Sequence, residues 1–275
     1  MRFYSEEDVR DFNSVKFLYI KTSFSSHIFT ITISRPEKRN AFTPTMAEEI
    51  TFALAYAHYN NEVRCLIINA EGPVFCAGAD LNAFHDISAD IKNATLPPIL
   101  EEAKLGDAFS EVCKPVIAQV EGPVLAGGFL IICGCTFVYS VNGAVFSLPE
   151  VKRGIWPMQV MASLNQIISP RKILEMCITG KSYNAAEALQ LGLITHITDA
   201  VKIADEVQVL AAQICENAPY AIQQGMKAFN NLKEIRGNEQ HSFLKAQLDH
   251  ILQSEDAKEG MQAFKEKRSP NWKGK

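Results

Sequence analysis

The sequence predicts an α/β protein that ends in a region made of helices alone. Over the first two-thirds of the 275 residues, strand-like runs alternate with helix-like runs, which is the order of an α/β fold. From Pro157 onward the pattern is mostly helical. Hydrophobic residues make up 47% of the chain, so a large core can form. We therefore expect a core over residues 15–200 and a C-terminal helical region over 201–275.

The first predicted elements are a hairpin, a helix and a buried strand. Val15–Lys21 and His27–Ser34 are β-rich runs on either side of a short polar segment, which is typical of a hairpin. The Thr43–Tyr59 segment has Pro at its first turn and predicts a helix. Arg64–Asn69 is almost continuously apolar, as in a strand that is covered on both faces.

Two loops that contain glycine follow buried strands in the middle of the chain. The first is Glu71–Asp80, and the second is Glu121–Phe129, which follows a strand over Lys114–Val120. A helix over Ile99–Val112 lies between them, and Ala126 opens an apolar helix that must be deeply buried. The remaining predicted elements are strands at Thr136–Ser140 and Val145–Leu148, and helices at Met158–Ile168, Pro170–Ile178 and Asn184–Leu191 and from about Val201, Pro219, Asn238 and Asp256.

Composition excludes several classes of partner. The net charge is −4, whereas a general nucleic-acid binder needs a broad basic face. The acidic N-terminal stretch Met1–Ser14 lacks the features of a secretory signal, and the longest apolar run is too short for a membrane span. Cys133 and Cys135 are the only close pair among seven cysteines, so we expect no metal site. A cytoplasmic location follows as the default.

The two glycine loops predict a shared chemical role. Each passes from a strand through a glycine turn into a helix start, where backbone amides favour negative charge. If the loops lie on neighbouring strands, one N–H from each can converge on a carbonyl oxygen and form an oxyanion hole. Either loop alone is commonly a mere chain reversal. Neither matches a P-loop or a dinucleotide-binding fingerprint.

Six segments in order resemble the landmarks of the crotonase (enoyl-CoA hydratase/isomerase) superfamily. The resemblance covers nearly everything from Phe17 to the C-terminus. The segments are Ser34–Ala41 (SRPEKRNA), Phe75–Asp80 (FCAGAD), Lys114–Gly122 (KPVIAQVEG), Ala126–Gly128 (AGG), Ser147–Glu150 (SLPE) and Thr179–Ile194.

This resemblance implies a repeated β-β-α spiral core, with the helical C-terminus completing a homotrimer or homohexamer. It implies an acyl-CoA thioester as substrate, with coenzyme A as part of that substrate and no further cofactor. The amides of Ala79 and Gly127 would bind the thioester oxygen. Among the remaining residues, it implies substrate contacts for Arg35, Lys38, Asn40, Ala77 and Asp80, the Arg35–Asn40 stretch lying near the nucleotide.

Several alternatives stay open for the basic segments. On charge alone, Arg35, Lys38 and Arg39 are equally well explained as a solvated basic turn. The tail Lys265–Lys273 is a second basic cluster that could close over the nucleotide.

The chain departs from the family's hydratase pattern at one position. Family hydratases use two glutamates to hold one water, the first of them three residues after the oxyanion-hole glycine. That position is Leu130 here, while the second glutamate is retained as Glu150. Without the resemblance, Glu150 would be explained as a helix cap or as an ion pair with Lys152 or Arg153. With it, we expect a buried carboxylate with a raised pKa that exchanges protons.

A single carboxylate favours Δ3,Δ2-enoyl-CoA isomerisation, which moves one proton within the substrate. The alternatives are a hydratase, a decarboxylase, or an acyl-CoA-binding oligomer that has lost catalysis. Trp156 is explained either by core packing or as a wall of the acyl pocket beyond the reacting carbons.

Overall fold

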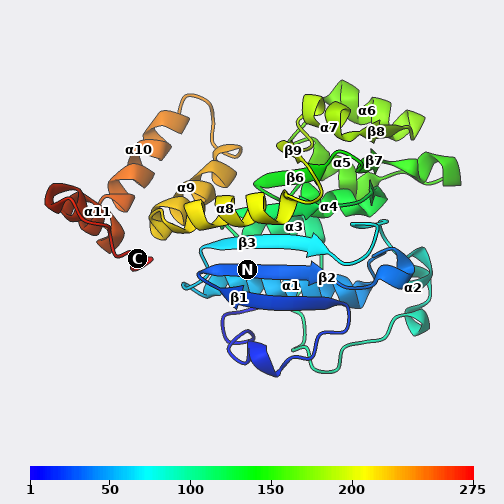
Figure 1. Ribbon diagram of the computed structural model, residues 1–275, viewed down its shortest axis with the longest axis horizontal. Coiled ribbons are helices and arrows are strands. Elements are labelled where there is room, and N and C mark those ends of the chain that lie inside the picture. Colours follow the sequence, from blue (N-terminus) through cyan, green and yellow to red (C-terminus); the bar gives the residue numbers. More distant parts are fainter.

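A six-stranded sheet forms the centre of the protein (Figure 1). The computed structural model describes residues 1–86 and 88–275, and the backbone alone of residue 87. The first two strands pair antiparallel and the others pair in parallel. In spatial order the strands are β1 (Ile20–Ser25), β2 (Ile28–Ile33), β3 (Cys65–Ala70), β4 (Val116–Val120), β6 (Phe137–Val141) and β9 (His196–Thr198).

The predicted hairpin is confirmed, but its first strand begins at Ile20 instead of Val15. The reason lies in helix α1 (Pro44–Tyr59), which matches its predicted range. The buried carboxylate of Glu49 on this helix accepts hydrogen bonds from the amides of Leu18 and Tyr19, at 2.8 and 2.9 Å. These amides bind a side chain, so strand pairing starts one residue later.

A smaller three-stranded sheet lies beside the first and carries the second glycine loop. Its strands are β5 (Val124–Leu125), β7 (Val145–Ser147) and β8 (Ser182–Asn184), with β5 parallel and β8 antiparallel to β7. The helical segments attached to it are η4 (Ala126–Gly128), α4 (Phe129–Ile132), η5 (Pro149–Arg153), α5 (Met158–Leu164), α6 (Pro170–Thr179) and α7 (Ala185–Leu191). This mixture of sheets and helices is the predicted α/β fold.

Three predicted helices are shorter than their patterns suggest, one of them being Met158–Ile168, which forms a helix only to Leu164. The segment Ile99–Val112 forms a helix only over α3 (Leu105–Glu111), because the Leu100 amide bonds to the carbonyl of Phe3. The apolar helix that opens at Ala126 ends at Ile132. It stops before Gly134, where a Cβ would lie 2.2 Å from the Cβ of Phe109.

Helices cover both faces of the main sheet (Figure 1). Helix α1 lies behind it, and α8 (Ile203–Cys215) crosses in front and packs against β3, β4 and β6. Helix α8 therefore belongs with the core, although the predicted boundary at residue 201 separates it. The helices that project from the body are α9 (Pro219–Leu232), α10 (Gln240–Ile251) and α11 (Glu255–Glu266); the remaining short segments are η1 (Phe12–Ser14), η2 (Pro36–Lys38), α2 (Leu81–His85) and η3 (Ile87–Ala89).

The acidic N-terminal stretch contributes to the core. Phe3 and Tyr4 are fully buried, and the Phe12 ring stacks on Tyr56 of α1 with centroids 3.9 Å apart. Aromatic rings at this separation contribute beyond the area they bury. Charged residues dominate this stretch of sequence, and its buried aromatic residues do not recur at helix or strand spacing. Their burial is therefore not apparent from the sequence.

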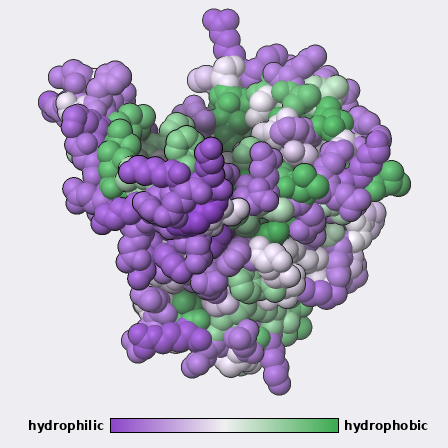
Figure 2. Space-filling view, turned by 60° about the vertical axis from the view of Figure 1, so that its left-hand side comes forward, coloured by the Kyte–Doolittle hydropathy of each residue, from purple (hydrophilic) through white to green (hydrophobic). Residues whose placement is uncertain are grey.

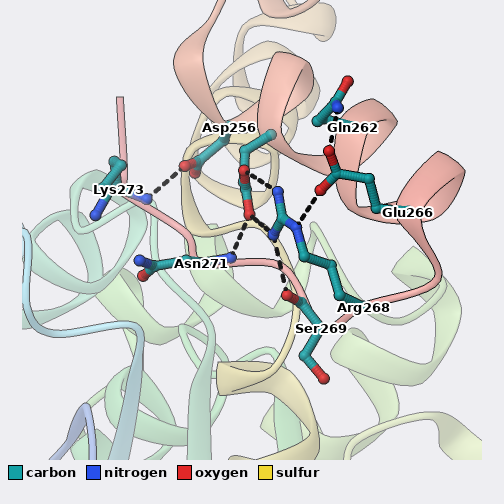
Figure 3. Close-up of polar contacts among 8 residues, drawn as sticks. Asp256, Gln262, Glu266, Arg268, Ser269, Asn271 and Lys273 are labelled. Atoms are coloured by element: carbon teal, nitrogen blue, oxygen red, sulfur yellow. Dashed lines mark hydrogen bonds and ion pairs between the residues drawn. The ribbon is translucent and has the colours of Figure 1, made fainter.

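The basic tail folds back on α11 (Figure 3). Arg268 forms a two-pronged ion pair with Glu259 at 2.6 and 3.0 Å, and the buried carboxylate of Asp256 accepts the Lys273 amide at 2.7 Å. The tail lies at the opposite end of this chain from α2 (Figure 1). Within this chain it therefore does not close over the Arg35 region. No helix among the described residues has both the length and the apolar character needed to cross a membrane.

Candidate active site

The two glycine loops lie side by side, joined by single bridges to neighbouring segments. Ala79 of the first loop pairs in parallel with Phe42, and Cys76 pairs in parallel with Val124 at the start of the second loop. The second bridge is closed by a hydrogen bond of 2.9 Å from the Leu125 amide to the Cys76 carbonyl. The chain therefore brings together two segments that lie about 50 residues apart in sequence, as the strand order requires.

These bridges leave two backbone donors free. Phe42 uses both its polar groups on the residues that flank Ala79, since its amide bonds to Gly78 O and its carbonyl accepts from Asp80, both at 2.9 Å. Within the described part of the chain, the Ala79 N–H makes no hydrogen bond, and it points away from Phe42 because the residues along an extended chain alternate. Gly127 is the second residue of η4, and the first N–H groups of a helix have no partner within it.

Gly78 allows the two loops to approach closely. Its φ is +94°, and a Cβ there would lie 2.6 Å from the Ala126 Cβ and 3.0 Å from the Gly127 nitrogen. A Cβ built at Gly127 would lie 3.4 Å from the Ala79 nitrogen. The two free amides therefore converge on one small region. This arrangement suits a single oxygen that carries negative charge.

Two hollows meet at this point. An apolar cavity of about 360 Å³ is lined by Ala79, Gly127, Leu130, Glu150 and Trp156 together with Phe42, Phe84, Ile155 and Met158. A more polar hollow of about 480 Å³ is lined by residues that include Arg35, Lys38, Arg39 and Asp80. Ala77, Ala79, Leu81, Pro149 and Arg153 line both. The free Ala79 amide thus stands where a long ligand with a polar and an apolar end would pass.

Among the described residues, Glu150 is the one carboxylate that lines the apolar cavity. It is 8% exposed, its Oε2 atom is buried, and that atom has no hydrogen-bond partner among the described residues. Burial raises the pKa of Glu150, which its own backbone and the charge of Arg153 only partly offset. In the described part of the chain, Glu150 makes neither a helix cap nor an ion pair with Lys152 or Arg153. The carboxyl is therefore available for proton exchange.

Leu130 and Trp156 line the same cavity as Glu150. Leu130 is 6% exposed and belongs to α4, so an apolar side chain stands where the family pattern has a second glutamate. The Trp156 indole nitrogen donates to the Met161 sulfur at 3.0 Å, which holds the ring in the wall. Trp156 packs against the core and also lines the cavity.

Two residues predicted to contact substrate are used inside the protein. The Arg35 guanidinium bonds to the Asp80 carboxylate at 2.8 Å and to the Ala41 carbonyl at 2.7 Å, and its side chain is only 10% exposed. Asn40 is fully buried; its side chain accepts from the Arg35 amide and donates to the carbonyls of Glu71 and Val74. The predicted substrate contact of Asn40 is therefore corrected to a positioning role.

Asp80, another residue predicted to contact substrate, also has a partner inside the protein, the Arg35 guanidinium. Burial opposes the charge of Asp80, but the hydrogen bond and the charge of Arg35 prevail and lower its pKa. Both residues still reach the polar hollow, beside Lys38 and Ala77. The pair fixes the start of α2 against the segment that precedes α1.

Sequence reasoning treated Arg153 only as a partner for Glu150, whereas the structure places it in the wall of both hollows. Phe42 and Phe84 were also missed, although their rings meet edge-on beside Ala79 with centroids 5.9 Å apart. The position of Arg153 could have been predicted from its separation of three residues from Glu150, because side chains at this separation on a short helical turn lie on the same side.

Comparison with known proteins gives a consistent result. A sequence model described as enoyl-CoA hydratase/isomerase matches residues 23–275. Carnitinyl-CoA dehydratase of Escherichia coli O157:H7 is 34% identical over 90% of this chain and 95% of its own, and mevalonyl-coenzyme A hydratase sidH of Aspergillus fumigatus is 30% identical over 90% and 92%. A crystal structure of enoyl-CoA hydratase from Mycobacterium tuberculosis H37Rv superposes with a TM-score of 0.81 at 28% identity, covering 94% of this chain and 99% of that one.

The close approach of the loops predicts an intolerant glycine. Gly78→Ala adds a Cβ at a positive φ and against Ala126, so we expect the free energy of unfolding to fall by about 2 kcal/mol or more. Gly143→Ala is the matched control, because nothing lies within 4 Å of its added Cβ, and it should change stability by less than about 1 kcal/mol. Urea unfolding measures both, and equal stabilities would mean that the loops do not touch.

The raised pKa of Glu150 predicts a pH-dependent gain in stability when its charge is removed. The folded protein holds this proton to higher pH than the unfolded chain does, so stability falls as pH rises from the ordinary glutamate pKa to the raised one. Glu150→Gln should therefore be more stable relative to wild type at about pH 8 than at about pH 4. The exposed Glu37→Gln provides the control. Urea unfolding at both pH values measures the stability of Glu150→Gln relative to wild type. If this stability difference shrinks as pH rises, the pKa of Glu150 is not raised.

Proposed function

Since this chain belongs to the enoyl-CoA hydratase/isomerase family, and so to enzymes that act on acyl-CoA, we propose that it converts 3-enoyl-CoA to 2-enoyl-CoA. One observation carries the proposal: among the described residues, Glu150 is the one carboxylate that lines the apolar cavity, its buried Oε2 atom has no hydrogen-bond partner, and it lies beside two free amides. Leu130 occupies the position of the second glutamate, so the cavity has one group that exchanges protons.

The reaction needs three groups of the protein. The thioester oxygen lies against the Ala79 and Gly127 amides, which stabilise the negative charge that develops on it. Glu150 removes a proton from C2, and the electron pair moves into the thioester to give an enolate. The same carboxyl then returns the proton to C4, the double bond moves from C3–C4 to C2–C3, and Glu150 is again ionised. One carboxylate suffices because the proton that leaves is the proton that returns.

The polar hollow suits the coenzyme A end of such a substrate. Lys38 and Arg39 line it, and no ion pair of either is found within the described part of the chain. Cationic side chains at this position attract phosphate groups. Ala79 lines the wall that the two hollows share, which supports a thioester position there, between the nucleotide and the acyl group.

Hydration of a 2-enoyl thioester is the second candidate. The relatives named above include a hydratase and a dehydratase, and both reactions use the same oxyanion hole and the same type of substrate. Hydration must deliver hydroxide to C3 and a proton to C2, and two carboxylates grip the water better than one. Leu130 provides no such grip, and for this reason we place hydration second.

The two candidates differ in their response to substitutions at Glu150 and Leu130. Glu150→Gln keeps the shape of the side chain and removes the base, so we expect the isomerase rate to fall by about 10²- to 10⁴-fold. Leu130→Glu supplies a second carboxylate and should raise the ratio of hydration to isomerisation. Leu130→Gln is the matched control, because it is polar and of the same size but cannot act as a base. The measurement is the rate on 3-enoyl-CoA and on 2-enoyl-CoA for all four proteins.

Two results would contradict the isomerase assignment. One is a wild-type protein that hydrates crotonyl-CoA efficiently and leaves 3-enoyl-CoA unchanged. The other is isomerisation that is indifferent to Glu150→Gln, which would assign the proton transfer to a different group.

We also propose that the chain assembles into a homotrimer or homohexamer through its projecting helices. Phe229 of α9 is 74% exposed, while Leu248 and Leu252 in and just after α10 are 53% and 50% exposed. Figure 2 shows hydrophobic side chains beside a hollow between the projecting part and the body. Exposed apolar surface on this scale marks an interface.

Light scattering tests the assembly at micromolar concentration. The mass should be three or six times the 30.5 kDa of one chain. Leu248→Glu should lower that mass, because it places a charge in the proposed interface. Val201→Glu is the control, since this residue is 87% exposed outside the projecting helices and should leave the mass unchanged. A monomeric wild-type protein would refute the proposal.

A further inference from the structure

We infer that the acyl group of the substrate carries a carboxylate, and that Arg153 binds it. The substrate class is then the CoA monothioester of an unsaturated dicarboxylic acid. This inference rests on the proposed function, because it takes the apolar cavity to hold the acyl group. It goes beyond that function by assigning a charge to the group.

Arg153 shares one short turn with Glu150. The turn is the 3₁₀ helix η5, which contains both residues at a separation of three. Side chains three apart in a 3₁₀ helix lie on the same side. Gly154, with a φ of +74°, ends the turn directly after Arg153. The helix therefore directs a carboxyl and a guanidinium toward the same cavity, and both line it.

The guanidinium of Arg153 has no partner within the protein. Among the described residues it makes neither a hydrogen bond nor an ion pair. Arg35, at the other side of the polar hollow, is held by Asp80 and by the Ala41 carbonyl. Both arginines line that hollow, yet only Arg35 is committed to the fold. Arg153 is left available to a ligand.

The charges that line the apolar cavity also favour an anion. Arg153 and Glu150 are its only ionisable lining residues within the described chain. Glu150 must be ionised to remove the C2 proton, and the charge of Arg153 then offsets its own. After that transfer the carboxyl is neutral, Leu130 adds no charge, and among the described lining residues Arg153 alone is charged. Arg153 is exposed at the edge of the cavity. A neutral acyl chain that covers its guanidinium would displace water and offer no hydrogen bond in return, which costs free energy. A carboxylate restores two charge-assisted hydrogen bonds in its place.

The position of Arg153 limits where that carboxylate lies. Arg153 lines the wall common to both hollows, together with Ala79, whose amide is the proposed site of the thioester oxygen. We therefore test a carboxylate that lies a few carbons from the reacting centre. A six-carbon chain provides a suitable probe.

Two thioesters that differ in one group test the inference. They are 3-hexenedioyl-CoA and 3-hexenoyl-CoA, which have the same carbon skeleton and end in a carboxylate and a methyl group respectively. In both, isomerisation moves one proton from C2 to C4. We expect the wild-type kcat/KM to be at least about tenfold higher for the dicarboxylic thioester, the scale of a hydrogen bond between charged groups.

Substitutions of Arg153 should change this preference. Arg153→Gln should lower the ratio of the two kcat/KM values by about tenfold to a hundredfold, and Arg153→Lys should lower it less, because it keeps the charge but not the two-pronged geometry. Lys152→Gln is the matched control: it removes the adjacent exposed cation, which lines neither hollow, and should leave the ratio unchanged.

A binding measurement separates this inference from the proposed function. Calorimetry with Glu150→Gln gives the Kd of each thioester without turnover. Tighter binding of 3-hexenedioyl-CoA that is lost in Glu150→Gln/Arg153→Gln supports the inference even if wild type isomerises neither compound, which would refute the function alone. Equal binding of the two thioesters overturns it. So does an Arg153→Gln protein that binds both thioesters and free coenzyme A equally weakly, since Arg153 would then hold the nucleotide.

Discussion

The contact between the two glycine loops is the constraint on which the rest of the site depends. Gly78 has no side chain, so the backbone of Ala126 and Gly127 lies against it. Ala126 itself has a φ of +50°, a conformation that costs a residue with a side chain about 1–3 kcal/mol. The fold sustains this strain because bridges to Phe42 and Val124 fix both sides of the contact. This contact brings the amides of Ala79 and Gly127 together within the fold itself.

Charges near the site divide into those that build it and those that face it. Arg35 and Asp80 form an ion pair, and the Asn40 side-chain amide makes hydrogen bonds with three backbone groups. Lys114 is also structural: it donates to the carbonyls of Ala57 and Asn60 at the end of α1, and burial lowers its pKa to about 7. Lys38, Arg39, Glu150 and Arg153 face the two hollows, and the last two belong to one turn.

The sequence predicted those features whose signals are local. Helix α1 was predicted with its correct ends because Thr43 caps it and Pro44 begins it. The two loops were predicted because each follows a buried strand. The Arg35–Asp80 pair could not be predicted, because its members are 45 residues apart and no local pattern connects them. The same holds for the N-terminal aromatic residues, whose partners lie on α1. The close approach of Phe109 to Gly134, just after the apolar helix, also joins two separate elements.

The 3₁₀ form of η5 sets the distance between the backbones of Glu150 and Arg153. Such a helix rises about 2 Å per residue, so the backbones of Glu150 and Arg153 are separated by about 6 Å along its axis. This spacing is set by backbone hydrogen bonds and does not depend on which side chains the turn carries. In the proposed binding mode, the anchor points of the base and of the cation are therefore set by the backbone, and a charged acyl chain beyond the reach of the Arg153 side chain would need a cation on another element.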